Sequence, residues 1–234
     1  MNVEQAFEMI ATQAVNNSTT PTTSTIIGTG TGSSGTKMAF HEAVKGGQVE
    51  QVKDLLMKDS GGSERERRDW LGRTPLMEAV ESGKVEIAAM LIDAGVNPNK
   101  QDNNVGETAL YVAISGKQSV EMIKVLIEGG AEMDKQVGEM KWTALHRAVE
   151  NEDNDAVTLL LNYGADKNKQ DKNGQTPLHL AVMKDHRYIM MSLLEAGADL
   201  SIKDNVESRR TPVELAQELV IFMFVKRMAL AGVG

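Results

Sequence analysis

The chain repeats one pattern of apolar and polar positions over most of its 234 residues. In the clearest copy, residues 176–181 read T-P-L-H-L-A, and a second apolar stretch ends in L-L at residues 193–194. Leu178 and Ala181 are three residues apart, which places both on one face of a helix. The pattern therefore predicts pairs of short helices, each with one apolar face.

Residues around these stretches have the properties of helix ends and turns. Thr176 is a good N-cap, and Pro177 fits the first helical position, where its missing N–H costs nothing. Gly174 allows the positive φ angle of a tight turn. Gly197 suits the left-handed position that ends the second helix. The copy thus predicts turn, helix, loop and helix in that order.

The pattern recurs at a nearly constant spacing. Successive alanines of the motif are 36, 34, 35, 33 and 35 residues apart, namely Ala43, Ala79, Ala113, Ala148, Ala181 and Ala216. A repeat of roughly 33 residues with short insertions accounts for all five spacings. Four copies are clear, whereas those at 38–43 and 210–216 are degenerate. Atypical terminal copies are expected in a repeat array, because one of their faces has no neighbour.

These motifs resemble the ankyrin repeat, and the resemblance covers about residues 38–230. It implies an all-α ankyrin-repeat solenoid of about four full repeats and two degenerate capping repeats, joined by β-turn or hairpin loops. We expect a disordered tail at residues 1–37 and an ankyrin-repeat domain at residues 38–234. In this family the expected function is binding of another protein, as a scaffold or adaptor without catalysis. An ankyrin-type inhibitor or regulator of a transcription factor or kinase is the alternative.

The amino-acid composition excludes several classes of function and location. The chain has no Cys, which excludes disulfides and thiolate metal sites and fits a reducing compartment. Its net charge of −8 argues against general nucleic-acid or anionic-membrane binding. No apolar run approaches the roughly 20 residues of a transmembrane helix, and no secretory signal is visible. We expect a monomer in the cytoplasm, the nucleus or both.

The N-terminal tail contains two features of its own. Residues 1–15 have apolar residues at helical spacing, which predicts either a short docking helix or a frayed terminus. Residues 16–37 are rich in Thr, Ser and Gly, as in flexible linkers. They include G-T-G-S-S-G at residues 30–35, but phosphate binding by such a loop needs a preceding strand and a following helix. A nucleotide-binding switch is therefore the less favoured alternative.

The four histidines do not indicate catalysis. His41, His146 and His179 occupy the same motif position, so the repeat explains them, and in this family the residue bonds the neighbouring turn. His186 falls in a loop between helices, where we expect it to be exposed. No His or carboxylates are predicted to converge outside the repeat pattern. We therefore expect no enzyme activity, metal or cofactor. The charged segment of residues 60–69 reads as a solvated loop.

The resemblance places partner contacts at the turn tips and on the exposed face of the first helix of each pair. The two Trp residues fall there, either as interface hot spots or as covers for their own turns. Met140 and Lys141 replace the turn glycine of one copy. The candidate partner-binding residues are Trp70, Leu71, Arg73, Glu81, Asn104, Glu107, Lys141, Trp142, Glu150, Asn173, Gln175, Met183 and Lys184.

The C-terminal end departs from the pattern. Thr211 and Pro212 can begin a helix, but seven apolar residues follow at 219–225. A helix whose apolar stripe spans about 100° cannot turn all seven toward one neighbour. Either another part of the chain covers them, or they form a second contact surface.

Overall fold

A computed structural model describes residues 39–206 and 209–219, which belong to the unit from Thr36 to Gly234. The predicted tail of residues 1–37 and residues 220–225 of the apolar run lie outside the described residues. No helix in the described part is long and apolar enough to span a membrane. The labelled helices are α2 (Ala39–Lys45), α3 (Val49–Lys58), α4 (Pro75–Glu81), α5 (Val85–Asp93), α6 (Ala109–Ser115), α7 (Val120–Glu128), α8 (Ala144–Glu150), α9 (Asn154–Asn162), α10 (Pro177–Met183) and α11 (Arg187–Glu195).

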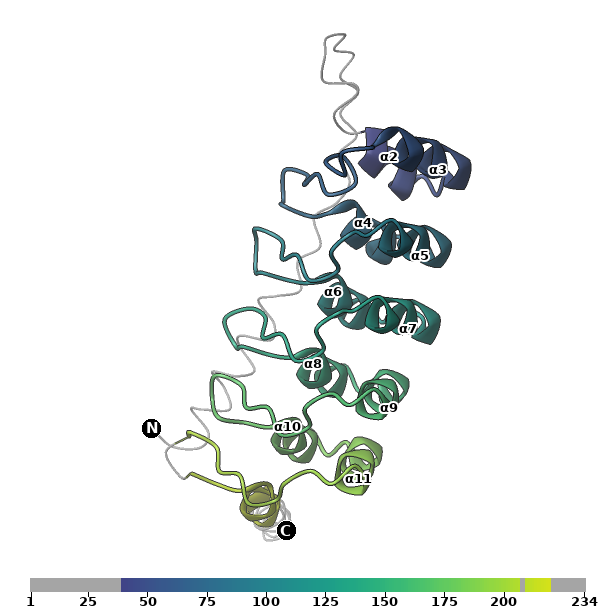
Figure 1. Cartoon of the computed structure of the whole chain (residues 1–234). Helices are drawn as coiled ribbons and strands as arrows, with labels where there is room; N and C mark the ends of the chain where they lie inside the picture. Colours follow the sequence, from purple (N-terminus) through teal and green to yellow (C-terminus); the bar gives the residue numbers. More distant parts are fainter. Residues whose placement is uncertain (1–38, 207–208, 220–234) are drawn as a thin grey trace, which may run out of the picture. The chain divides into compact units, whose positions relative to one another are not determined.

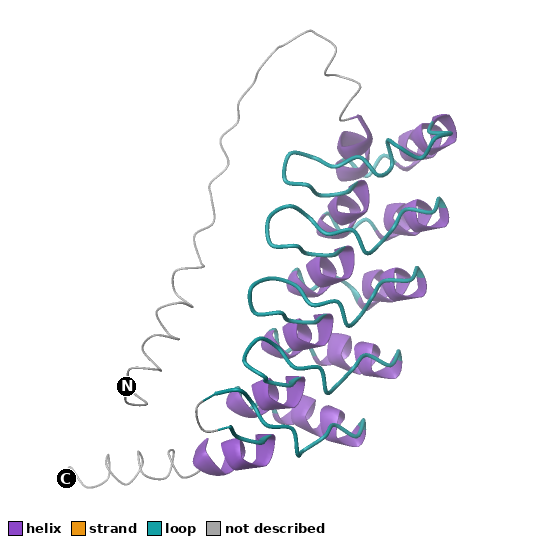
Figure 2. Ribbon diagram, turned by 60° about the vertical axis from the view of Figure 1, so that its left-hand side comes forward, coloured by secondary structure: helices purple, strands orange, loops and turns teal. Residues whose placement is uncertain are grey.

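The helices form consecutive antiparallel pairs that stack in chain order (Figure 1). The first helices of the pairs, α2, α4, α6, α8 and α10, pack on one another as an inner row. The second helices of the pairs, α3, α5, α7, α9 and α11, pack on one another as an outer row. Figure 2 shows the loops between pairs leaving the stack on the side of the inner row. This is the predicted all-α repeat stack, and the degenerate first copy also forms both of its helices.

The inner helices begin as the sequence predicts. Thr74, Thr108, Thr143 and Thr176 each accept a hydrogen bond from the backbone N–H three residues later. This satisfies one of the amides that a helix start leaves without a partner. The shared N-cap sets the first residue of each inner helix, and it therefore sets which residues face the core.

The core consists of small and large apolar residues in alternation along the stack. The motif alanines Ala79, Ala113, Ala148 and Ala181 have no exposed surface, so neighbouring inner helices approach closely there. Leucines of the same motif fill the space beside them. Each pair buries its apolar face only against its neighbours, as in other repeat arrays.

The charged segment of residues 60–69 is less solvated than predicted, because six of its ten residues are half-buried and four are exposed. The Asp59 carboxylate accepts backbone N–H bonds from Glu64 and Arg65 at 3.2 and 3.0 Å. Arg65 donates to the backbone oxygen of Ala94 at 2.7 Å, and Glu66 pairs with Lys100 at 2.9 Å. The charges of this segment thus attach it to the second repeat.

Candidate protein-binding surface

The turn tips are shaped by a carboxylate at their base. In the turn at 171–175, Asp171 Oδ1 accepts the backbone N–H groups of Asn173 and Gln175 at 2.8 and 2.9 Å. Asp69 does the same for Leu71 and Arg73. Such Asp-centred turns are a regular use of this side chain. These bonds therefore fix the backbone conformation of the tips, and with it the positions from which their side chains project.

The turn before α8 reaches a similar form by another route. It has no Asp at the base, and Val137 and Trp142 pair instead as an antiparallel bridge. Lys141 takes the positive φ angle of 53° that a glycine would adopt more easily, and Gly138 supplies a second positive φ of 69°. The replacement of the turn glycine thus changes the turn type but preserves the tip.

Backbone hydrogen bonds join each tip to the next. They run from Asn103 N to Leu71 O, Gly138 N to Val105 O, Lys172 N to Met140 O, and Asn205 N to Asn173 O, at 2.7–3.2 Å. A Cβ on Gly174 would lie only 2.7 Å from the Asn205 nitrogen, so this close approach requires glycine. We call this set of bonds the tip ladder. It holds the tips in one continuous row.

Four tips along this row present large apolar side chains to solvent. The exposed fractions are 84% for Trp70, 47% for Val105, 36% for Met140 and 36% for Val206. The sequence analysis selected Trp70 but missed the other three. Their distance in sequence from the next inner helix differs from that of Trp70, so the repeat alignment did not pair them with it. Their alignment becomes visible only through the tip ladder.

The two Trp residues differ in their surroundings. Trp70 is largely exposed, whereas Trp142 is half-buried and packs against the hydrophobic core. The Trp142 indole N–H also donates to Asp171 Oδ2 at 3.2 Å, across to the next turn. Trp142 therefore supports its own tip and the neighbouring one, while Trp70 is available for contact.

The structure divides the candidate residues by exposure. Gln175 is buried at 6% exposure, which differs from the surface position expected for it, and its amide lies 3.3 Å from the sulfur of the exposed Met183. The exposed candidates are Trp70, Glu81, Asn104, Lys141, Met183 and Lys184. The half-buried ones are Leu71, Arg73, Glu107, Trp142, Glu150 and Asn173. The role of both groups in binding stays a prediction.

Charged and polar bonds cross between repeats on the face of the inner helices. Lys184 pairs with Glu150 at 2.8 Å, and Arg147 donates to the Ser115 hydroxyl at 3.1 Å. Glu107 lies on the same side, where burial and the neighbouring Asp102 raise the pKa of its carboxyl. This face is therefore polar, in contrast to the apolar tips.

The histidines of the motif bond the neighbouring turn, as predicted. His146 Nε2 lies 3.1 Å from the Gln175 backbone oxygen, and His179 Nε2 lies 3.0 Å from that of Arg210. His186, expected to be exposed, is instead half-buried beside Glu152. His41 occupies the motif position as well, but one of its ring nitrogens lies within 4.8 Å of a carboxylate oxygen of Asp69 and one of Glu78, a grouping that the sequence analysis did not identify.

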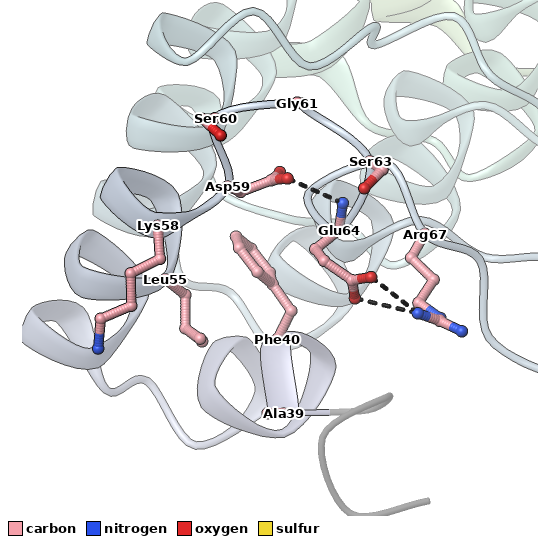
Figure 3. A pocket seen from close by; sticks show the side chains of 10 residues that line it. All are labelled: Ala39, Phe40, Leu55, Lys58, Asp59, Ser60, Gly61, Ser63, Glu64 and Arg67. Carbon is pink, nitrogen blue, oxygen red and sulfur yellow. Dashed lines mark hydrogen bonds and ion pairs between the residues drawn. The ribbon is translucent and has the colours of Figure 1, made fainter.

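A pocket of about 570 Å³ lies beside α2, α3 and the segment that follows them (Figure 3). Phe40 and Leu55 form its apolar part. Glu64 pairs with Arg67 at 2.8 Å, and the Asp59 carboxylate already accepts backbone bonds. The acidic groups of the pocket thus serve to hold the segment in place.

A stack of helix pairs with a row of linked turn tips defines the class of helical repeat proteins. The sequence model described as "Ankyrin repeats (3 copies)" matches residues 9–102, 40–137, 92–171 and 119–204. The chain belongs to the ankyrin-repeat family, whose fold is typically a non-enzymatic module for protein interaction.

Known proteins resemble the chain over most of its length. It is 30% identical to human "Transient receptor potential cation channel subfamily A member 1" over 183 residues, covering 76% of the chain and 16% of that protein. Mouse "Rabankyrin-5" is 32% identical over 173 residues, covering 74% and 14% respectively. The chain thus corresponds to a small part of these longer relatives.

A solved structure has the same fold. It is described as "Bd0816 Predatory Endopeptidase from Bdellovibrio bacteriovorus in complex with immunity protein Bd3460". The match has a TM-score of 0.63 at 29% identity and covers 77% of the present chain and 91% of the matched chain.

Proposed function

We propose that the protein binds a partner protein through its turn tips and the exposed face of its inner helices, without chemistry of its own. It would act as a monomeric scaffold or adaptor in the cytoplasm or nucleus. The family supports protein binding in general, whereas the surface on this chain is our inference from exposure and from the arrangement of the tips.

The observation that carries the proposal is the row of exposed apolar residues on linked tips. Trp is among the commonest interface hot spots, and Trp70 is 84% exposed in the free chain. Clustered exposed apolar side chains on soluble proteins commonly mark contact sites. Val105 lies on the next tip, which the bond between Asn103 and Leu71 holds beside the first.

The tip ladder also affects how strongly such a surface binds. A flexible loop loses conformational freedom when it is ordered by a partner, and this loss weakens binding. The tips are already ordered by backbone bonds between repeats. A partner that contacts several tips therefore meets them in a fixed register, which favours affinity and selectivity.

Affinity purification from the native cell, read by mass spectrometry, tests the proposal. We expect Trp70→Ala to reduce recovery of the main partner at least tenfold. Tyr188→Ala is the matched control, because Tyr188 is 81% exposed but lies on the outer helix α11. Equal loss in both variants, or loss only in Tyr188→Ala, would place binding on a different face.

An inhibitor that binds one enzyme is the second candidate. The solved complex of an endopeptidase with an immunity protein favours it, because that structure has the same fold. If the purified partner is an enzyme, adding the protein at increasing concentration should lower its activity. If the activity of the partner enzyme stays unchanged when it is saturated with the protein, the inhibitor function is contradicted and the scaffold function remains.

A further inference from the structure

The contact between α2 and α4 contains a buried carboxylate, Glu78, that the later described inner helices lack at the same position. His41 comes from α2, Glu78 from α4, and Asp69 from the turn between the two pairs. One nitrogen of His41 and one oxygen of each carboxylate lie within 4.8 Å of one another. At the position of Glu78 the later inner helices have Val112, Arg147 and Leu180.

The imidazole of His41 has one bonded nitrogen and one without a partner. Nε2 lies 2.9 Å from the Arg67 backbone oxygen, so Nε2 carries the proton when the ring is neutral. Nδ1 then has a lone pair, and it is buried without a hydrogen-bond partner among the described residues. The whole residue is only 5% exposed. A buried polar atom of this kind is uncommon and calls for an explanation.

The later repeats show what Nδ1 normally does. In His146 it lies 2.8 Å from the Thr143 hydroxyl, and in His179 it lies 2.9 Å from that of Thr176. The equivalent residue of the first copy is Met38, which has no hydroxyl. Among the described residues, no group therefore takes up the lone pair of His41 Nδ1.

The carboxylates near His41 exceed the cations that compensate them. Arg73 contacts three of them: Asp69 at 2.8 Å, Glu78 at 3.4 Å, and Glu81. Glu78 is only 6% exposed, and this long contact is its only ion pair in the described part. A buried carboxylate needs strong compensation, and three acids share one guanidinium here. Lys45 also acts on Glu81, but three acids against two cations still leave the cluster negative.

We propose that His41 Nδ1 and the carboxylates of Glu78 and Asp69 bind one divalent cation of the zinc class. Imidazole and carboxylate oxygens are ordinary zinc ligands, and zinc sites with three protein ligands are well established. The bond from Nε2–H to the Arg67 carbonyl is the second contact that typically orients a metal-binding histidine. Two carboxylates also match the charge of the ion.

To form the site, ligand atoms that now lie within 4.8 Å of one another would have to move closer together. Zinc bonds of about 2.0–2.2 Å bring tetrahedral ligand atoms to roughly 3.4 Å from one another. Arg73 would release Asp69 Oδ2 and keep its bond to Glu81, while Asp69 Oδ1 remains on the two backbone amides of its turn. The bound ion would join the first repeat to the second.

Isothermal titration of the full chain, without a histidine tag and at neutral pH, tests the site with zinc chloride. We expect one ion per chain and a rise in the melting temperature, because an ion that binds only the folded state stabilises it. Magnesium at the same concentration is the control, since it prefers octahedral oxygen ligands. The chain has no Cys and four His, which limits competing sites.

Two variants separate the site from other causes. Glu78→Gln removes one ligand, and Met38→Thr supplies the hydroxyl that occupies Nδ1 in the later repeats while keeping His41. We expect each to weaken zinc binding at least tenfold, and we expect Glu150→Gln, on α8, to leave it unchanged.

The outcomes are distinct. A folded wild-type chain that binds no zinc overturns the proposal. Binding that survives both Glu78→Gln and Met38→Thr places the ion elsewhere and also overturns it. If Glu78→Gln does not fold, Met38→Thr decides alone, because its substitution adds a group that the fold accommodates in the neighbouring repeats.

Discussion

The contacts of α2 with α4 and of α8 with α10 use the same histidine of the same motif, but with different results. His146 bonds at both nitrogens, to Thr143 and to Gln175, and it has no exposed surface. Within the part of the chain that the structure describes, His41 bonds at one nitrogen only. The comparison shows that the Thr before the helix determines whether the histidine is a satisfied structural group or a group with a spare lone pair.

The largest expected effect comes from removing each histidine in turn. His146→Ala should lower the free energy of unfolding by about 3 kcal/mol, because it removes two bonds and leaves a cavity at a fully buried position. His41→Ala should cost about 1 kcal/mol less, since both rings are buried but only one nitrogen of His41 is bonded among the described residues. Urea unfolding in the presence of a metal chelator measures both values.

Equal losses in the two variants would contradict the comparison. They would mean that the packing of the ring, rather than its hydrogen bonds, determines its contribution. A chelator is needed because a bound ion would add to the contribution of His41.

A second comparison sets Trp142 against Trp70. Trp142→Ala should lower the free energy of unfolding by about 2 kcal/mol, because Trp142 packs on the core and donates to Asp171. Trp70→Ala should change it by less than about 0.5 kcal/mol, as for other exposed positions. Thermal unfolding of both variants measures the difference. Similar losses would show that Trp70 covers its turn and is no free contact residue.

The last prediction is a dependence of stability on pH, to which each histidine contributes a small part. Burial lowers the pKa of His146 and His179, so both stay neutral in the folded chain below the ordinary value of about 6.5. The unfolded chain binds more protons in that range, so stability falls as the pH is lowered through about 6.5. Between pH 7 and 5.5 we expect a loss of about 1 kcal/mol for each histidine.

Urea unfolding at the two pH values tests this dependence, and His146→Gln should remove part of it. A variant that keeps the full dependence would assign the effect to other groups. The loss concerns the middle and last repeats, where both histidine nitrogens are occupied.

Much of the fold could be predicted because the same sequence motif occurs several times along the chain. Thr176, Gly174 and His179 each have the local role that their residue type suggests, and the spacing of the alanines gave the order of the pairs. Such features depend on residues close in sequence. The turn before α8 was harder to predict, because Lys141 has a backbone angle that its residue type rarely adopts.

The surface was less predictable, because exposure depends on neighbours from another repeat. Gln175 is a polar residue at a turn tip, yet it is 6% exposed, and its amide bonds the Met183 sulfur. Val105 and Met140 look unremarkable in the sequence, and they become neighbours through bonds that join residues about one repeat apart. The same is true of His41 and Glu78, which no local motif connects.

The tip ladder has a mechanical consequence. Each of its bonds joins only two adjacent repeats, for example Met140 with Lys172 and Asn173 with Asn205. A force that draws the repeats apart would therefore load these bonds one step at a time, together with the local helix contacts. In an array with nearest-neighbour coupling, such a load is released in steps of one repeat rather than in a single rupture.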